Sequence, residues 1–165
     1  MESNWMRKSL KSFALKLINF WPPYLGAGIR VSKMSGDFRR VEVEMSLRFW
    51  NQNYVGTHFG GSLYAMCDPF FMLILMKNLG DDYIVWDKAA TIRFKRPGRG
   101  KVKAVFAIDH ETIQNIRREA DSAEKVTPTF FATVKDESGS IVAEVEKLLY
   151  VRRKDRAAPK SQRLN

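Results

Sequence analysis

Alternating apolar and polar residues predict several strands in this chain. From Arg40 to Trp50 the apolar positions of one face are Val41, Val43, Met45, Leu47 and Phe49. The residues between them are mostly charged or polar, which is typical of an antiparallel strand with one buried and one exposed face. Turn-forming residues at 35–37, 97–100 and 136–139 separate the strand segments. Further strands are predicted over residues 29–34, 83–96, 101–109, 126–135 and 141–152.

Two other segments have helical spacing. Between Trp5 and Trp21, apolar residues recur every three or four positions, with lysines on the other faces. Pro22 and Pro23 are predicted to end this helix. We expect it to pack on the domain or on a partner subunit, and a basic amphipathic helix lying on a membrane surface is the alternative. A short polar helix is predicted over 112–124.

The run from Leu63 to Met76 is apolar except for Asp68. It predicts a helix that is buried on every side and is too short to cross a bilayer. An unpaired carboxylate inside such a helix costs several kcal/mol, so Asp68 needs a partner or a function. Pro69 predicts a kink directly after it, because proline removes a hydrogen bond to the carbonyl of Ala65.

The order of these elements predicts an α+β fold. A helix and two strands precede the buried helix, and four strands follow it. A curved antiparallel sheet wrapped around one apolar helix explains why that helix has no polar face. We predict a single domain over residues 1–153 and a disordered basic tail over 154–165.

Composition narrows the classes of function. The chain has 165 residues, a net charge of +10, one cysteine and two histidines. These counts exclude an internal disulfide and a cysteine-based zinc cluster, and they argue against a metal site. The charge favours an anionic partner, such as a phosphate-bearing cofactor, a membrane or nucleic acid, but no nucleic-acid-binding motif is present. No signal peptide is evident, so a cytoplasmic location is expected.

Residues 53–68 carry a resemblance to a known family. With this order of elements, the positions of Asn53, Gly56, His58, Gly60-Gly61 and Asp68 resemble the hotdog superfamily. In particular, the chain resembles the phenylacetate-pathway-type acyl-CoA thioesterases and their thioesterase-like relatives. Those proteins have a His-Gly-Gly turn before the central helix and a catalytic aspartate seven residues after the second glycine. Here Phe59 separates the histidine from the first glycine. The resemblance covers about residues 22–153, and only 53–68 match at motif level.

The resemblance implies thioester hydrolysis. Backbone N–H groups of Gly61 or Ser62 would polarise the thioester carbonyl at the helix start. Asp68 would act as general base or nucleophile. Asn53 would hold the water or the carbonyl, and His58 would orient water or substrate. The structural alternatives are a tightly packed glycine turn, a hydrogen-bonded carboxylate, a turn asparagine and a serine that only begins the helix.

Substrate binding follows from the same resemblance. Gly60 would let the substrate approach the backbone closely. A basic hairpin that includes Arg93, Lys95 and Arg96 would receive the phosphates of coenzyme A, and its alternative is a charged sheet edge. The acyl pocket would be lined by Phe70, Phe71, Met72 and Trp86, which could equally be core residues. Coenzyme A enters as part of the substrate, and no other cofactor and no metal is implied.

The resemblance also implies a homodimer or a homotetramer, with the small-molecule acyl thioester as ligand. In several relatives the carboxylate and the oxyanion donor come from opposite subunits. A non-catalytic acyl-binding protein on the same fold is the alternative function. A basic protein acting at a membrane through the first helix is a third possibility. A dehydratase of this fold is disfavoured, because no histidine has the standard spacing at the helix start.

Overall fold

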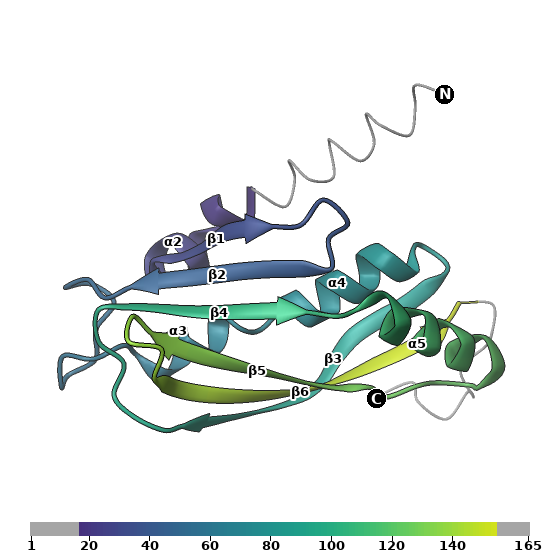
Figure 1. Ribbon diagram of the computed structural model, residues 1–165. Coiled ribbons are helices and arrows are strands. Elements are labelled where there is room, and N and C mark those ends of the chain that lie inside the picture. Colours follow the sequence, from purple (N-terminus) through teal and green to yellow (C-terminus); the bar gives the residue numbers. More distant parts are fainter. Residues whose placement is uncertain (1–16, 155–165) are drawn as a thin grey trace, which may run out of the picture.

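The computed structural model describes residues 17–154, which form one curved antiparallel sheet with helices (Figure 1). Residues 1–16, with most of the predicted first helix, and 155–165, with most of the predicted tail, lie outside the described residues. The strand order is β1-β2-β4-β5-β6-β3. The strands are β1 (Ile29–Met34), β2 (Arg40–Ser46), β3 (Tyr83–Phe94), β4 (Lys101–Ala107), β5 (Thr129–Asp136) and β6 (Ile141–Arg153).

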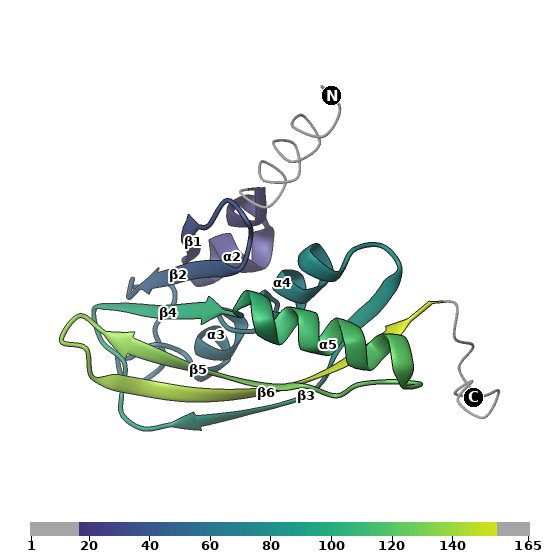
Figure 2. The same ribbon diagram turned by 45° about the vertical axis from the view of Figure 1, so that its right-hand side comes forward.

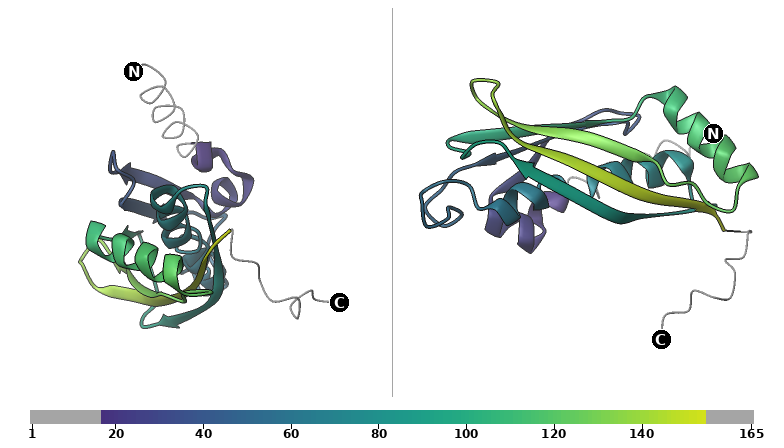
Figure 3. Two further views of the ribbon diagram at one scale, coloured as in Figure 1. Left: turned by 90° about the vertical axis from the view of Figure 1, so that its right-hand side faces the viewer. Right: turned by 90° about the horizontal axis from the view of Figure 1, so that it is seen from below.

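The sheet curves around a central pair of helices, as the end-on view shows (Figure 3, left). The helical elements are η1 (Leu17–Phe20), α2 (Pro22–Ala27), α3 (Gly60–Ala65), α4 (Phe70–Leu79) and α5 (His110–Ser122). In Figure 2 α5 lies in front of α4 near one end of the sheet. None of the helices within residues 17–154 has the length and apolar character needed to cross a bilayer. The predicted curved sheet around a buried helix is confirmed.

The predicted central helix is divided in two. Residues 66–69 separate α3 from α4, because Pro69 has no N–H to donate to the carbonyl of Ala65. The phenol of Tyr24 donates to that carbonyl instead, at 3.2 Å. Complete burial of this segment was also wrong, since Met76 of α4 is 46% exposed.

The strand β2 keeps the predicted alternation only in part. Val41, Val43 and Met45 are fully buried, but the strand ends at Ser46 and Phe49 is 83% exposed. The buried side chain of Asn51 accounts for this early end. Its amide donates to the carbonyl oxygens of Ser46 and Ala27, and its oxygen accepts from the N–H of Arg48. These bonds fold residues 47–51 into a turn.

Two further boundaries differ from the prediction. Pro22 and Pro23 follow η1, which ends at Phe20, but they also begin α2, which suits proline because the first helical N–H groups need no intrahelical acceptor. The helix α5 begins at His110, two residues earlier than predicted. Its N-cap is Asp109, whose carboxylate accepts from the N–H of Thr112 at 2.7 Å.

Candidate active site

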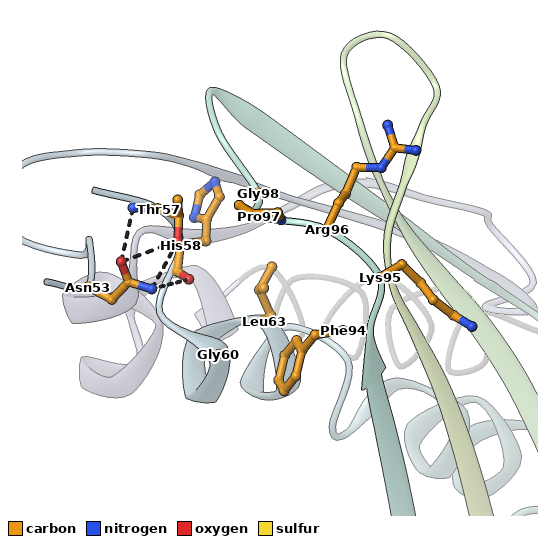
Figure 4. Close-up of a pocket in the computed structure, with 10 residues that line it drawn as sticks. All are labelled: Asn53, Thr57, His58, Gly60, Leu63, Phe94, Lys95, Arg96, Pro97 and Gly98. Atoms are coloured by element: carbon orange, nitrogen blue, oxygen red, sulfur yellow. Dashed lines mark hydrogen bonds between the residues drawn. The ribbon is translucent and has the colours of Figure 1, made fainter. Parts of the chain in front are cut away.

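A pocket of about 440 Å³ opens beside the start of α3. It lies between the loop before α3 and the loop that joins β3 to β4 (Figure 4). Its lining residues are Asn53, Thr57, His58, Gly60, Leu63, Phe94, Lys95, Arg96, Pro97 and Gly98. Five of the predicted site residues are therefore brought together here, namely Asn53, His58, Gly60, Lys95 and Arg96.

Asn53 organises the loop before α3. Its side-chain oxygen accepts from the N–H groups of Val55 and Thr57, at 3.1 and 3.0 Å. Its amide donates to the Thr57 hydroxyl at 2.9 Å and to the His58 carbonyl at 3.5 Å. All of these partners lie within five residues of Asn53, so its side chain fixes the local turn in the way asparagine commonly does.

His58 is buried between this turn and the loop of Gly98. Its Nε2 lies 3.0 Å from the carbonyl oxygen of Gly100, so Nε2 carries the proton and donates. Nδ1 is buried and has no hydrogen-bond partner among the described residues. Burial lowers the pKa of the imidazole, and the bond to Gly100 only partly opposes this. The neutral ring therefore ties the two loops of the pocket together.

The start of α3 leaves two backbone donors without acceptors among the described residues. The N–H of Ser62 donates to the Phe59 carbonyl at 3.0 Å, so this predicted donor is already occupied. The N–H groups of Gly60 and Gly61 make no such bond. A side chain on Gly60 would approach the Phe94 ring to 3.0 Å, so glycine keeps the pocket open at this point.

The basic residues of the β3–β4 connection divide into two groups. Lys95 and Arg96 line the pocket, with their charged ends directed away from His58 (Figure 4). Lys95 pairs with Glu144 at 2.9 Å. Arg93, near the end of β3, does not line the pocket, and its guanidinium pairs with Glu146 of β6 at 3.6 Å.

Asp68 lies outside this pocket, in the break between α3 and α4. Its side chain is 49% exposed. One oxygen, Oδ1, accepts from the Tyr64 phenol at 2.7 Å and from the Lys147 ammonium at 2.9 Å. The other oxygen, Oδ2, accepts no hydrogen bond from the described residues. The neighbouring Cys67 is buried, which raises the pKa of its thiol to about 12 and makes it a poor nucleophile.

Lys147 and Asp87 are the residues that sequence reasoning missed. Lys147 is fully buried on β6, and its Nζ also pairs with Asp87 of β3 at 2.9 Å. Both residues occupy inward positions of their strands, where the alternation otherwise places apolar residues such as Val85 and Val145. A lysine at an inward strand position could have drawn attention to this cluster, because buried lysines need acidic partners.

Burial alone would lower the pKa of Lys147, but hydrogen bonds to Asp68, Asp87 and Tyr64 raise it to about 12. The lysine is therefore an ammonium at neutral pH. Burial also raises the pKa of Asp87, against the opposing effect of Lys147. We call Tyr64, Asp68, Asp87 and Lys147 the lysine cluster.

Five residues expected to bind substrate lie elsewhere. Phe71 is buried in the core, where its ring stacks on Phe130 with centroids 5.0 Å apart. Trp86 is half exposed and stacks on Tyr150 at 4.9 Å. It faces away from the central helices because inward positions alternate along β3 and fall on Val85 and Asp87. Together with Arg93, Phe70 and Met72, these residues do not line the pocket.

The free glycine amides and the free oxygen of Asp68 are separated within one chain. Gly60 lines the pocket at the start of α3, whereas Asp68 lies beyond the C-terminal end of α3. The pocket beside Gly60 is therefore not lined by the Asp68 of the same chain. Among residues 17–154, no three His, Cys, Asp or Glu side chains are placed to hold a metal ion.

Comparison with known proteins identifies the family. The model of a domain of unknown function, DUF4442, matches residues 10–151. The chain belongs to the DUF4442 family. Among curated proteins, none matches this DUF4442 chain significantly.

Solved structures similar to the DUF4442 chain share its fold. PA5026 from Pseudomonas aeruginosa, described as a probable thioesterase of unknown function, has 24% identity and a TM-score of 0.75, over 87% of this chain and 95% of its own. Thioesterase HI1161 from Haemophilus influenzae has 16% identity and a TM-score of 0.64, over 84% and 88%. OLEI01261 from Chlorobaculum tepidum, of unknown function, has 16% identity and a TM-score of 0.70, over 89% and 97%. The DUF4442 chain thus has the hotdog fold.

Proposed function

We propose that this protein hydrolyses acyl thioesters of coenzyme A or of an acyl-carrier protein. The observation that carries the proposal is the state of Asp68, a half-exposed carboxylate held through Oδ1 with Oδ2 left free. A carboxylate so arranged can take a proton from water. The hotdog fold supports the proposal, because structures of this fold include the thioesterase HI1161 and the probable thioesterase PA5026.

The proposed reaction needs one base and one site for the oxyanion. Asp68 Oδ2 takes a proton from water as the water oxygen attacks the thioester carbonyl carbon. The carbonyl oxygen becomes negative, and the N–H groups of Gly60 and Gly61 stabilise it. The carbon–sulfur bond then breaks, and the thiolate takes the proton back from Asp68. The products are a carboxylic acid and a free thiol.

We propose that a homodimer completes this site. The long strand β3 lies at one edge of the sheet, and an unpaired edge is suited to pairing with a second copy. Pairing through this edge would bring two copies of the lysine cluster together, since Lys147 is paired in register with Ala90 of β3. The Asp68 of one protomer would then face the glycine amides of its partner.

Arg96 and Lys95 are proposed to receive the phosphates of coenzyme A at the rim of the pocket. Lys95 is already paired with Glu144, whereas Arg96 makes no ion pair within 4 Å of a described carboxylate. Arginine is well suited to phosphate, because its planar guanidinium donates two parallel hydrogen bonds. The thioester end of acyl-CoA would then lie toward Gly60.

A second candidate function is acyl-thioester binding without hydrolysis. It is favoured by the position of Asp68 outside the pocket that holds His58 and Gly60. Thiol release from short, long and aromatic acyl-CoA esters, measured beside calorimetric binding of the same esters, tests the two functions. Hydrolysis supports the proposed function, while binding without thiol release by the folded protein supports the second candidate.

A further inference from the structure

Lys147 is a buried cation in a strand face that is otherwise apolar. The inward residues around it on β6 are Val145 and Leu149, both buried. Its Nζ contacts three oxygens, those of Asp68 at 2.9 Å, Asp87 at 2.9 Å and Tyr64 at 3.2 Å. An ammonium has three N–H donors, so each of them has an acceptor. The desolvation cost of burying the charge is offset only by such complete pairing.

The cluster contains one more carboxylate than neutralisation of the lysine requires. Asp87 is the more buried of the two, with 25% of its side chain exposed against 49% for Asp68. Asp87 Oδ1 is buried without a partner among the described residues, and Asp87 Oδ2 pairs with the Lys147 ammonium at 2.9 Å. Asp87 therefore pairs with Lys147 on the more buried side of the cluster. Lys147 has a further N–H, which donates to the more exposed Asp68.

The backbone does little to position Asp68. The chain leaves α3 at Ala65, and the N–H of Asp68 lies 3.4 Å from the Ala65 carbonyl, at the long end of hydrogen bonding. Pro69 follows directly and has no N–H, so the hydrogen-bond pattern of an α-helix is interrupted there. The orientation of the carboxylate is set instead by two donors on the same oxygen, the phenol of Tyr64 and the ammonium of Lys147. Both leave Oδ2 open.

We propose that Lys147 is a positioning residue for hydrolysis, which holds Asp68 by Oδ1 so that Oδ2 meets the attacking water. The inference rests on the proposed function and adds a residue to it. Asp87 holds Lys147 in place, and the Tyr64 phenol donates the second hydrogen bond to Asp68 Oδ1. Because Lys147 is fully buried, it acts through Asp68 and has no contact with substrate.

The test compares variants that keep the charges balanced. Lys147→Met alone leaves two carboxylates without their cation and can fail to fold. The double variant Lys147→Met/Asp87→Asn removes one charge of each sign from the cluster and keeps similar side-chain volumes. Val145→Ala, at the next inward position of β6, is the control for lost packing on the same strand. Lys147→Arg tests rescue by another cation.

The readouts are Tm, kcat and KM on the best acyl-CoA ester. We expect the folded double variant to keep KM within about threefold while kcat falls at least about tenfold, a loss of transition-state stabilisation rather than of binding. Lys147→Arg should recover part of kcat, and Val145→Ala should lower Tm with kcat within about threefold.

A folded double variant with kcat within about threefold of wild type, beside an inactive Asp68→Asn, overturns the positioning role and leaves the hydrolase intact. Equal losses of kcat in the double variant and in Val145→Ala also overturn it, because strand packing then explains the effect. Absence of thiol release by the wild-type protein overturns the proposed function itself, and the positioning role falls with it.

Discussion

Lys147 Nζ lies 2.9 Å from Asp68 Oδ1, although the two residues are 79 positions apart in the chain. The lysine comes from β6 and the aspartate from the break between α3 and α4. Asp68, the only charged residue of the apolar run from Leu63 to Met76, thus pairs with the buried Lys147 of the sheet. This pair links the fold to the proposed chemistry, and it generates the first prediction.

Lys147→Met should destabilise the protein strongly. Removing one partner of a buried ion pair leaves the other charge uncompensated, so we expect the free energy of unfolding to fall by about 3 kcal/mol. Adding Asp87→Asn should restore part of this loss. Urea unfolding at neutral pH measures both changes. A single variant as stable as wild type would show that the lysine is not an essential counter-ion.

Stability should decrease below neutral pH because of His58. Its pKa is lowered by burial in the folded protein, so the unfolded chain binds the proton more readily. The stabilising contribution of the neutral ring is complete above the pKa of histidine in the unfolded chain, about 6.5. It is lost as the pH falls through the lower pKa of His58 in the folded protein.

Thermal unfolding between pH 7 and 5 tests this prediction. His58→Gln should make Tm less dependent on pH across this range, at the cost of a lower Tm at pH 7. The matched control is His110→Gln, since His110 is exposed at the start of α5. An unchanged pH dependence of Tm in His58→Gln, or a weaker pH dependence of Tm in His110→Gln, would contradict the prediction that His58 causes this loss of stability.

Arg96→Gln should weaken the binding of acyl-CoA. We expect KM to rise several-fold at low salt and the difference to shrink at high salt, because the lost contact is electrostatic. Arg93→Gln is the control, since that side chain pairs with Glu146 and does not line the pocket. A short thioester of N-acetylcysteamine, which lacks phosphates, should show the same KM in all three proteins. Equal effects of the two substitutions on acyl-CoA would refute the phosphate contact.

Mixed dimers should reveal a site shared between subunits. Asp68→Asn removes the base, and Gly60→Val closes the pocket against Phe94, so each variant alone should be inactive. After unfolding and refolding together in equal amounts, half of the dimers are mixed, and each has one intact site. Activity should return to about a quarter of wild type. No recovery from a mixture shown to contain mixed dimers would place the whole site within one protomer.

The sequence predicted those parts of the molecule that depend on local patterns. Period-two alternation located the strands, and the loop of Asn53, His58 and Gly60 is nearly contiguous in the chain. The early end of β2 depends on the buried amide of Asn51, which bonds to Ala27 on another element, and no local pattern predicts that contact. Lys147 and Asp87 were missed for the same reason, since they lie on β6 and β3 and meet Asp68 in the break between α3 and α4.

The most direct measurement is thiol release from the best acyl-CoA ester by wild type and by Asp68→Asn. Asparagine keeps the shape of the side chain and cannot take a proton from water. We predict equal folding and similar substrate binding, with kcat lower by at least about a hundredfold, or roughly 2.7 kcal/mol of barrier. Hydrolysis by Asp68→Asn at the wild-type rate would contradict the account, and Asp68 would then be a structural carboxylate that neutralises Lys147.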